Sequence, residues 1–279
     1  MMATLKKAQS QRVGERDSPS LSSFPLFSSA SFVRFLWVVL VVSHSIAVIA
    51  AESHSDRFHR VYLEARAHSR KLTNDADAAW QFARACFDRA DFTANDDQRA
   101  AFAEEGIAAS RRAIALQPKS AAGHYYLALN SGQLAQTKLW GALKLIDGME
   151  EAWKKTIELD ARFDYAGAHR SLTLLYRDAP GWPTSVGSRS KARLHIQKAL
   201  QLCPEYPGNQ ICWLESQIKW GEAKAVRTQI AAVEERLKVA RLKFTGEQWA
   251  RDWEEWDERW RKVKVKVGIV PARSSRHAP

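Results

Sequence analysis

Three segments of the chain share one pattern of side-chain types and lie 43 residues apart: RRAIALQP (111–118), KKTIELDA (154–161) and QKALQLCP (197–204). Each segment has the character of the second half of a helix that is followed by a stop. A fixed period in this range is typical of stacked helical units, because one unit cannot bury its apolar face alone and neighbouring units must share a core. The period therefore predicts an all-α protein with the architecture of an α-solenoid.

Aligning the three segments predicts which positions face the shared core. Two repeat positions are the most informative: the small or β-branched residues Ala113, Thr156 and Ala199, and the leucines Leu116, Leu159 and Leu202. We expect the small residues where helices cross closely. We expect each leucine to be buried, so that its replacement by alanine would cost about 2–5 kcal/mol.

The small residues, together with Pro118 and Pro204 at the ends of two units, resemble the tetratricopeptide repeat, although Ala161 replaces the proline in the middle unit. The usual period of that repeat is about 34 residues, so each unit here is about nine residues longer. We place the extra residues between the two helices of each unit, around 88–97, 133–144 and 178–188. Insertions at equivalent points lie on one side of a solenoid and predict a binding surface there.

A narrower resemblance rests on the third unit, DYAGAHRSLTLLYRDAPGWPTSVGSRSKARLHIQKALQLCPEYPGN (164–209). This run resembles the periplasmic tetratricopeptide family that includes the T-component of TRAP transporters, and the similarity covers roughly residues 75–220. The resemblance implies an all-helical, exported protein that assists a substrate-binding protein or holds an apolar ligand in a helix-lined cleft.

After the repeat domain, which we place at 52–222, residues 223–270 predict a pair of capping helices. Apolar residues recur in steps of four and three in two runs that are separated by Thr245–Gly246. The second run carries a stripe of tryptophans at positions 249, 253, 256 and 260. We expect this stripe to turn inward as a cap; the alternative is an exposed aromatic surface for a membrane or a partner. Residues 271–279 are predicted to form a disordered tail.

Residues 1–51 are predicted to form a leader. An apolar run at 35–51 follows Arg34 and ends in Ala50–Ala51, which is typical of a secretory signal. Cleavage would leave Ala51 or Glu52 at the start of an exported, periplasmic protein. The alternative is an uncleaved segment that anchors the chain in the inner membrane.

Charge and cysteine content exclude some classes of partner. The net charge is +11, but no basic cluster interleaved with aromatic residues occurs in the repeat region, so we predict no nucleic-acid partner. The spacing of the three cysteines fits no metal motif. Cys203 and Cys212 are either buried thiols or, in an exported chain, partners in a disulfide.

Candidate binding residues are the polar and aromatic side chains near the predicted insertions: Tyr125, Asn130, Gln133, Tyr165, His169, Arg170 and Trp182. His169 and Arg170 follow Tyr165 and precede a loop that carries Trp182, a grouping that suits an anionic or polar ligand. The alternative for His169 and Arg170 is a structural network that fixes the loop. Trp182 is predicted to be either a hydrophobic plug or a platform for a ligand.

No nucleophile–base signature, phosphate-binding glycine loop or metal-ligand spacing occurs in the sequence, so we predict no enzyme activity and no cofactor. The predicted function is that of an exported repeat scaffold that binds a protein partner. The alternative is an accessory component of a TRAP-type solute transporter, which would bind an apolar small ligand in a cleft near Trp182 and Tyr165. A membrane-tethered assembly factor would follow if residues 35–51 stay attached.

Overall fold

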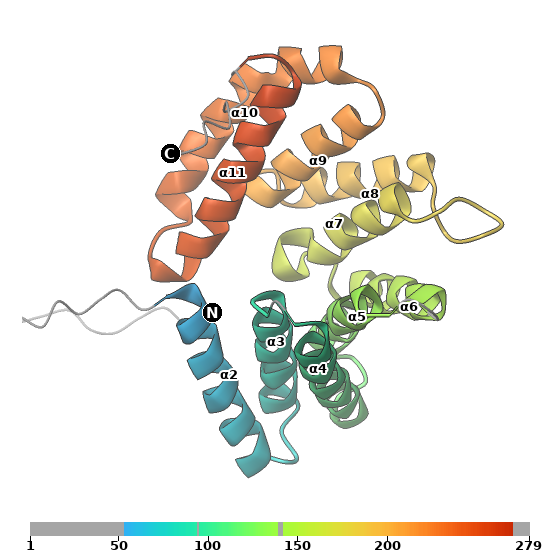
Figure 1. Cartoon of the computed structure of the whole chain (residues 1–279), viewed down its shortest axis with the longest axis vertical. Coiled ribbons are helices and arrows are strands. Elements are labelled where there is room, and N and C mark those ends of the chain that lie inside the picture. Colours follow the sequence, from blue (N-terminus) through green and yellow to red (C-terminus); the bar gives the residue numbers. More distant parts are fainter. Residues whose placement is uncertain (1–52, 94, 139–141, 270–279) are drawn as a thin grey trace, which may run out of the picture. The chain divides into compact units, whose positions relative to one another are not determined.

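The computed structural model describes residues 53–269, except for residues 94 and 139–141, and these residues belong to one compact unit. The first half of this unit contains α2 (His54–Lys71), α3 (Ala76–Asp91), α4 (Asp96–Leu116), α5 (Ala121–Gln136) and α6 (Ala142–Asp160). The second half contains α7 (Phe163–Asp178), α8 (Arg189–Leu202), α9 (Pro207–Lys219), α10 (Ala223–Lys243), the short 3₁₀ helix η1 (Glu247–Trp249) and α11 (Ala250–Lys266) (Figure 1). The predicted leader and tail lie outside the described residues.

Local sequence signals explain where these helices begin and end. A side-chain oxygen caps the first turn of five helices, from Ser53, Asp75, Asn95, Ser120 and Ser188. Each oxygen accepts the backbone N–H three residues later, which satisfies one of the free donors at a helix start. Proline follows the ends of α4, α7 and α8 at Pro118, Pro180 and Pro204, where it cannot continue the helix.

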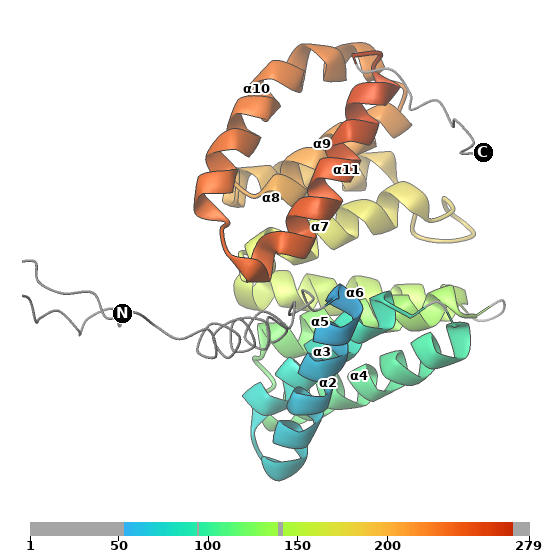
Figure 2. The same ribbon diagram turned by 60° about the vertical axis from the view of Figure 1, so that its left-hand side comes forward.

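Consecutive helices pack as hairpins, α3 with α4, α5 with α6 and α7 with α8, and each hairpin packs on the next (Figure 2). The aligned small residues Ala113, Thr156 and Ala199 are all fully buried, as expected for positions of close helix crossing. The prediction of an all-α solenoid of tetratricopeptide-like hairpins is thus confirmed. Within the described ranges no strand forms, and Gly181 and Gly187 make only an isolated bridge.

The prediction of three buried leucines is wrong. Leu116 is 40% exposed, and Leu159 and Leu202 are only half-buried. The physical reason is their place in the last turn of each helix, where fewer neighbouring side chains cover them: Leu116 and Leu202 are the final residues of α4 and α8, and Leu159 is the last but one of α6. Leu172 and Leu214, which lie inside helices, are fully buried instead.

The extra length of each unit is distributed differently from the prediction. In the first two units most of it extends the helices, so that α3 runs to Asp91 and α5 to Gln136. Among the residues that the structure describes, a long loop forms only at 179–188, between α7 and α8. This loop is held to the end of α7 because Gly187 N donates to Pro180 O at 2.8 Å and Ser188 N donates to Tyr176 O at 2.8 Å.

The C-terminal helices α10 and α11 both pack on α9 and complete an apolar cluster. Trp256 and Trp260 are buried, and Trp249 and Trp253 pack partly buried against the same cluster. The tryptophan stripe therefore turns inward, and the alternative of an exposed aromatic surface is wrong. The proposed boundary between a repeat domain and capping helices at 222/223 stays a prediction.

Two further observations concern the cysteines and the membrane. Cys203 and Cys212 are buried free thiols and do not form the alternative disulfide. No helix among those described is both long enough and apolar enough to cross a bilayer.

Candidate functional site

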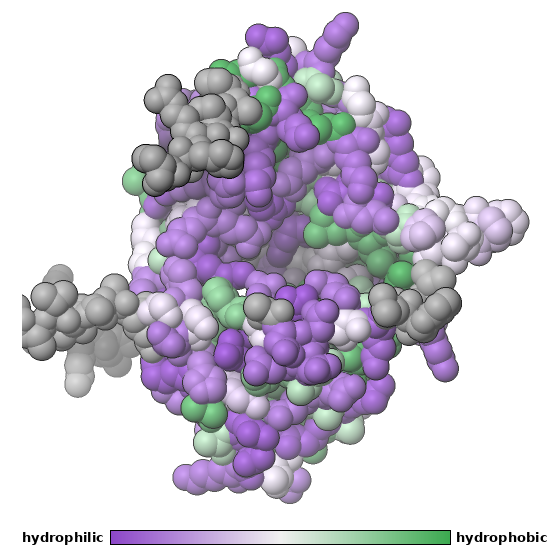
Figure 3. All heavy atoms as spheres, viewed as in Figure 1, coloured by the Kyte–Doolittle hydropathy of each residue, from purple (hydrophilic) through white to green (hydrophobic). Residues whose placement is uncertain are grey.

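A cleft in the described unit is lined by the alternate helices α3, α5, α7, α9 and α11, with α2 at one end. It consists of an inner pocket of about 360 Å³ and a second pocket of about 640 Å³ between α2, α3 and the start of α11. The two pockets share Arg84, Asp88, Arg251 and Asp252, and we call their combined surface the inner cleft. Figure 3 shows the hollow, whose visible walls are mainly hydrophilic.

The first turn of α7 is distorted and brings Asp164 to the inner cleft. Asp164, Tyr165 and Ala166 have φ angles of 49°, 54° and 60°, in the left-handed region. This region is costly for residues other than glycine, so the surroundings must hold the turn in place. The Tyr125 hydroxyl donates to Asp164 Oδ2 at 2.6 Å, and Arg170 donates to the same oxygen at 3.1 Å.

Arg170 connects this turn to the next unit. Its guanidinium donates to Asn209 Oδ1 at 3.1 Å and lies 4.9 Å from the ring centre of Tyr206. Asn209 is fully buried and donates in turn to Tyr165 O at 3.1 Å. The polar network therefore joins α5, α7 and α9, and it fixes one wall of the inner cleft.

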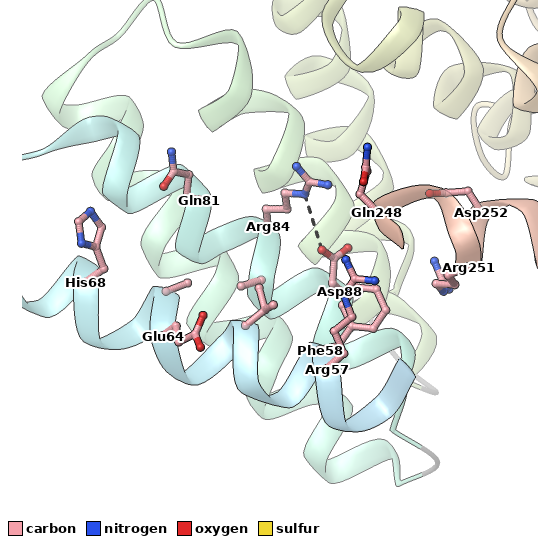
Figure 4. Close-up of a pocket in the computed structure, with 13 residues that line it drawn as sticks. Arg57, Phe58, Glu64, His68, Gln81, Arg84, Asp88, Gln248, Arg251 and Asp252 are labelled. Atoms are coloured by element: carbon pink, nitrogen blue, oxygen red, sulfur yellow. Dashed lines mark ion pairs between the residues drawn. The ribbon is translucent and has the colours of Figure 1, made fainter. Parts of the chain in front are cut away.

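Asp88 and Asp252 give the shared part of the two pockets its electrostatic character (Figure 4). Burial raises the pKa of Asp88 to about 6, although Arg84 and Arg251 act in the opposite direction. The contact with Arg84 is long, with 3.7 Å between Arg84 Nε and Asp88 Oδ2. Burial also raises the pKa of Asp252, and within the described chain Asp252 has no ion-pair partner at contact distance. Both carboxylates are therefore incompletely compensated.

Arg251 joins the last helix to the first two. Its guanidinium lies 4.8 Å from the ring centre of Phe92 and 5.8 Å from that of Phe58, and it forms an ion pair with Asp91. A second contact follows nearby, because Arg57 donates to the backbone oxygen of Glu247 at 2.9 Å. These contacts bring η1 and α11 against α2 and α3 at one end of the inner cleft.

Some of the predicted binding residues lie at the inner cleft. Tyr125 and Arg170 line its inner pocket. Tyr165 does not line it, because its ring stacks on Tyr206 with 4.6 Å between centres and packs in the C-terminal apolar cluster. Gln133 is buried at a neighbouring pocket, where its amide lies 3.4 Å from Asp91 Oδ1.

The other predicted residues are separate from the inner cleft. Asn130 is fully buried and donates to Ala83 O at 3.0 Å and to Tyr126 O at 2.8 Å, a structural role. His169 pairs with His195, with 2.9 Å between their Nδ1 atoms, and burial together with the charges of His195 and Lys198 lowers the pKa of His169 to about 4. In the described ranges no three His, Cys, Asp or Glu side chains are grouped to hold a metal ion.

Trp182 is 89% exposed, so its interpretation as a hydrophobic plug is wrong. The apolar cleft predicted near Trp182 and Tyr165 is also misplaced. An apolar pocket of about 610 Å³ lies beside the inner cleft, and its apolar lining includes Phe87, Leu129, Ile146, Met149, Trp153, Leu174 and Leu175. Neither Trp182 nor Tyr165 lines this pocket.

Sequence reasoning missed Asp88, Arg251 and Asp252. The only local signal was the spacing of Arg84 and Asp88, which are four residues apart and lie on one helix face. Such a pair is usually an ordinary solvated ion pair. The contact that makes these residues part of a cleft joins Arg251 to Asp91 across 160 residues of sequence, and no local pattern indicates it.

Comparisons with known proteins support the fold and find one family model that matches part of the chain. The family model described as "Regulator of microtubule dynamics protein 1-3" matches residues 44–161, less than half of the chain. The crystal structure of a thermophilic TPR protein from Thermus thermophilus is similar to 85% of this chain and 100% of that chain, with a TM-score of 0.55 and 13% sequence identity. Such a likeness shows the fold alone. No curated protein matches the chain, and the predicted closeness to the TRAP T-component family is not confirmed.

The distorted turn of α7 gives a first testable prediction. A Cβ atom at Gly167 would lie 2.4 Å from Tyr125 Oη and 2.6 Å from Asp164 Oδ2. We expect Gly167→Ala to disrupt this contact and to lower the free energy of unfolding by about 1–3 kcal/mol. Gly148→Ala on α6 is the matched control, because a Cβ there has no neighbour within 4 Å and alanine should stabilise the helix by about 0.5–1 kcal/mol. Equal effects in urea unfolding would contradict a tightly packed turn.

The raised pKa of Asp88 gives a second testable prediction. The folded-state pKa of about 6 exceeds the value of about 3.9 expected in the unfolded chain. Between these values the unfolded chain loses the proton while the folded chain keeps it, so Asp88 lowers stability progressively as the pH rises from about 4 to about 6. The stability gained by Asp88→Asn relative to wild type should therefore grow over this window and then level off. Urea unfolding at several pH values measures it, with exposed Asp97→Asn as control; a gain independent of pH would refute the assignment.

Proposed function

We propose that this chain is a non-catalytic repeat scaffold that binds a segment of a protein partner in the inner cleft. Successive helical hairpins place polar and charged side chains from helices distant in sequence on one hollow surface, the kind of surface that repeat proteins use for binding. The likeness to a thermophilic TPR protein supports the proposal through the fold only.

The observation that carries the proposal is the pair of incompletely compensated carboxylates, Asp88 and Asp252, in the shared part of the two pockets. Burial raises the pKa of each, which means that the protein alone stabilises their charged forms poorly. A Lys or Arg side chain from a partner would supply the missing positive charge in a partly desolvated site, where charge-assisted hydrogen bonds are strong. The preferred segment therefore carries at least one basic residue.

Selection of random displayed peptides on the immobilised full chain tests this proposal. We expect the enriched peptides to contain Lys or Arg at a recurring position. The double variant Asp88→Asn and Asp252→Asn should weaken their binding by about tenfold or more, as measured by fluorescence anisotropy. Asp97→Asn, on the exposed first turn of α4, is the control and should leave binding unchanged.

Circular dichroism and thermal melting establish that the double variant is folded. Enriched peptides without a basic residue, or equal affinity for wild type and the folded double variant, would contradict the proposed site. Microtubules are the first candidate source of the bound segment, because the description of the matched family model names a regulator of microtubule dynamics. Cosedimentation of wild type and the same variants with microtubules tests this candidate directly.

The apolar pocket beside the inner cleft favours a second function, the binding of a small apolar ligand by an accessory component of a solute transporter. Its lining is mainly Phe, Leu, Ile, Met and Trp side chains, with few polar groups, as in many small-molecule sites. Native mass spectrometry of the purified full chain would find a bound small molecule if this function is correct, and a ligand-free spectrum would count against it.

As an alternative to a microtubule partner, which an exported chain would not meet, we propose that the protein is exported, on the basis of the apolar run at 35–51 alone. In the host cell the mature chain should begin at Ala51 or Glu52. N-terminal sequencing measures this directly, and an intact leader on a membrane-bound chain would instead support the anchor.

A further inference from the structure

A charged pocket of about 440 Å³ lies apart from the inner cleft, between α2, α3 and α4. It shares no lining residue with the inner cleft. α3 lies between α2 and α4 (Figure 1), and Phe82 of α3 contributes an apolar surface. The polar lining comes from Arg66, Ser69 and Arg70 of α2 and from Glu105 and Arg112 of α4. We call this the arginine pocket.

The arginine pocket carries an excess of positive charge. Its one carboxylate, Glu105, is already engaged: it pairs with Arg66 at 3.1 Å and accepts the Tyr62 hydroxyl at 2.9 Å. Three guanidinium groups and one carboxylate leave the pocket with two uncompensated positive charges, assigned to Arg70 and Arg112.

The donors of these two arginines are incompletely used. Arg112 donates to Ser69 O at 3.2 Å and also contacts Ser69 Oγ, but its buried Nε has no hydrogen-bond partner. Arg70 is exposed at the last turn of α2, and no hydrogen bond or ion pair joins it to another described residue. Both hydrogen bonds of Arg112 use Nη2, and its Nη1 forms no hydrogen bond with another described residue, so Nη1 can donate to an acceptor supplied from outside the chain.

We propose that the arginine pocket binds a phosphate monoester. Such a group carries a charge of about −1.5 to −2 at neutral pH, which matches the excess charge of the pocket, whereas a carboxylate matches only half of it. Its oxygens suit the planar fork of a guanidinium, which donates two parallel hydrogen bonds. Phe82 beside the arginines provides an apolar contact for the organic part of the ligand.

Isothermal titration of the full chain with phenyl phosphate tests the proposal. Arg70→Ala and Arg112→Ala should each weaken binding by about tenfold or more, because each removes charged hydrogen-bond donors. Arg111→Ala, at an exposed neighbour outside the pocket, is the matched control and should leave binding unchanged. Arg70 makes no contact that the fold needs, so its variant separates loss of binding from loss of folding. Benzenesulfonate, a monoanion of similar shape, should bind more weakly than phenyl phosphate.

A second arm identifies the source of the phosphate. Vesicles that contain phosphatidylinositol 4-phosphate are compared with phosphatidylserine vesicles of equal charge. If the chain prefers the vesicles with phosphatidylinositol 4-phosphate and Arg70→Ala removes that preference, the ligand is a lipid headgroup. If the chain shows no such preference but still binds phenyl phosphate, the ligand is a soluble phosphate monoester. The proposal is overturned if phenyl phosphate fails to bind at millimolar concentration, or if Arg111→Ala weakens binding as much as Arg70→Ala.

Discussion

The ion pair between Asp164 and Arg170 is the interaction on which the wall of the inner cleft depends. Asp164 lies in a turn whose left-handed backbone is unfavourable by itself, and the hydroxyl of Tyr125 and the guanidinium of Arg170 hold it there. Through Asn209, the same guanidinium reaches the next unit. The pair is only partly buried, with the Arg170 side chain 16% and the Asp164 side chain 35% exposed, so its net contribution to stability is modest. Here its effect is geometric: it sets how three successive units meet and so places the side chains that line the cleft.

The charge of the cleft differs in character from that of the whole chain. The chain carries a net charge of +11, yet five carboxylates and four guanidinium groups line the inner pocket: Asp88, Asp91, Asp164, Asp252 and Glu255, with Arg84, Arg170, Arg251 and Arg259. Interleaved charges of both signs contribute more to selectivity than to affinity. A partner whose charges do not match the pattern places at least one charged group beside a group of the same sign, which repels it. The arginine pocket between α2, α3 and α4 has the opposite balance. The two sites would therefore recognise ligands of different charge without competing.

Features that depend on local pattern were predictable from the sequence, and features that depend on long-range contact were not. The small repeat residues such as Ala113 were placed correctly because helix crossing needs a small side chain whatever surrounds it. Leu116 was misplaced because alignment gives no indication of where a neighbouring helix ceases to cover its partner. Tyr125 and Arg170 were chosen as polar and aromatic residues near the predicted insertions, and both line the inner pocket, although their role in binding stays a prediction. Asp88 and Asp252 were missed because their environment arises only when α11 reaches α3, and Trp182 was misjudged because an exposed loop and a packed loop have the same composition.

The contact of Arg251 with the stacked rings of Phe58 and Phe92 has a consequence for the cooperativity of the domain. In an open array of repeats, each unit interacts only with its neighbours, and the terminal units fray first because each lacks one neighbour. Here the last helix gives the first two the neighbours that they would otherwise lack, through contacts that span 160 to 200 residues. Closing such a long loop costs chain entropy that grows only slowly with length. Opening one end of the array would remove contacts that support the other end. The free energies of local unfolding at the two ends are therefore coupled and not independent.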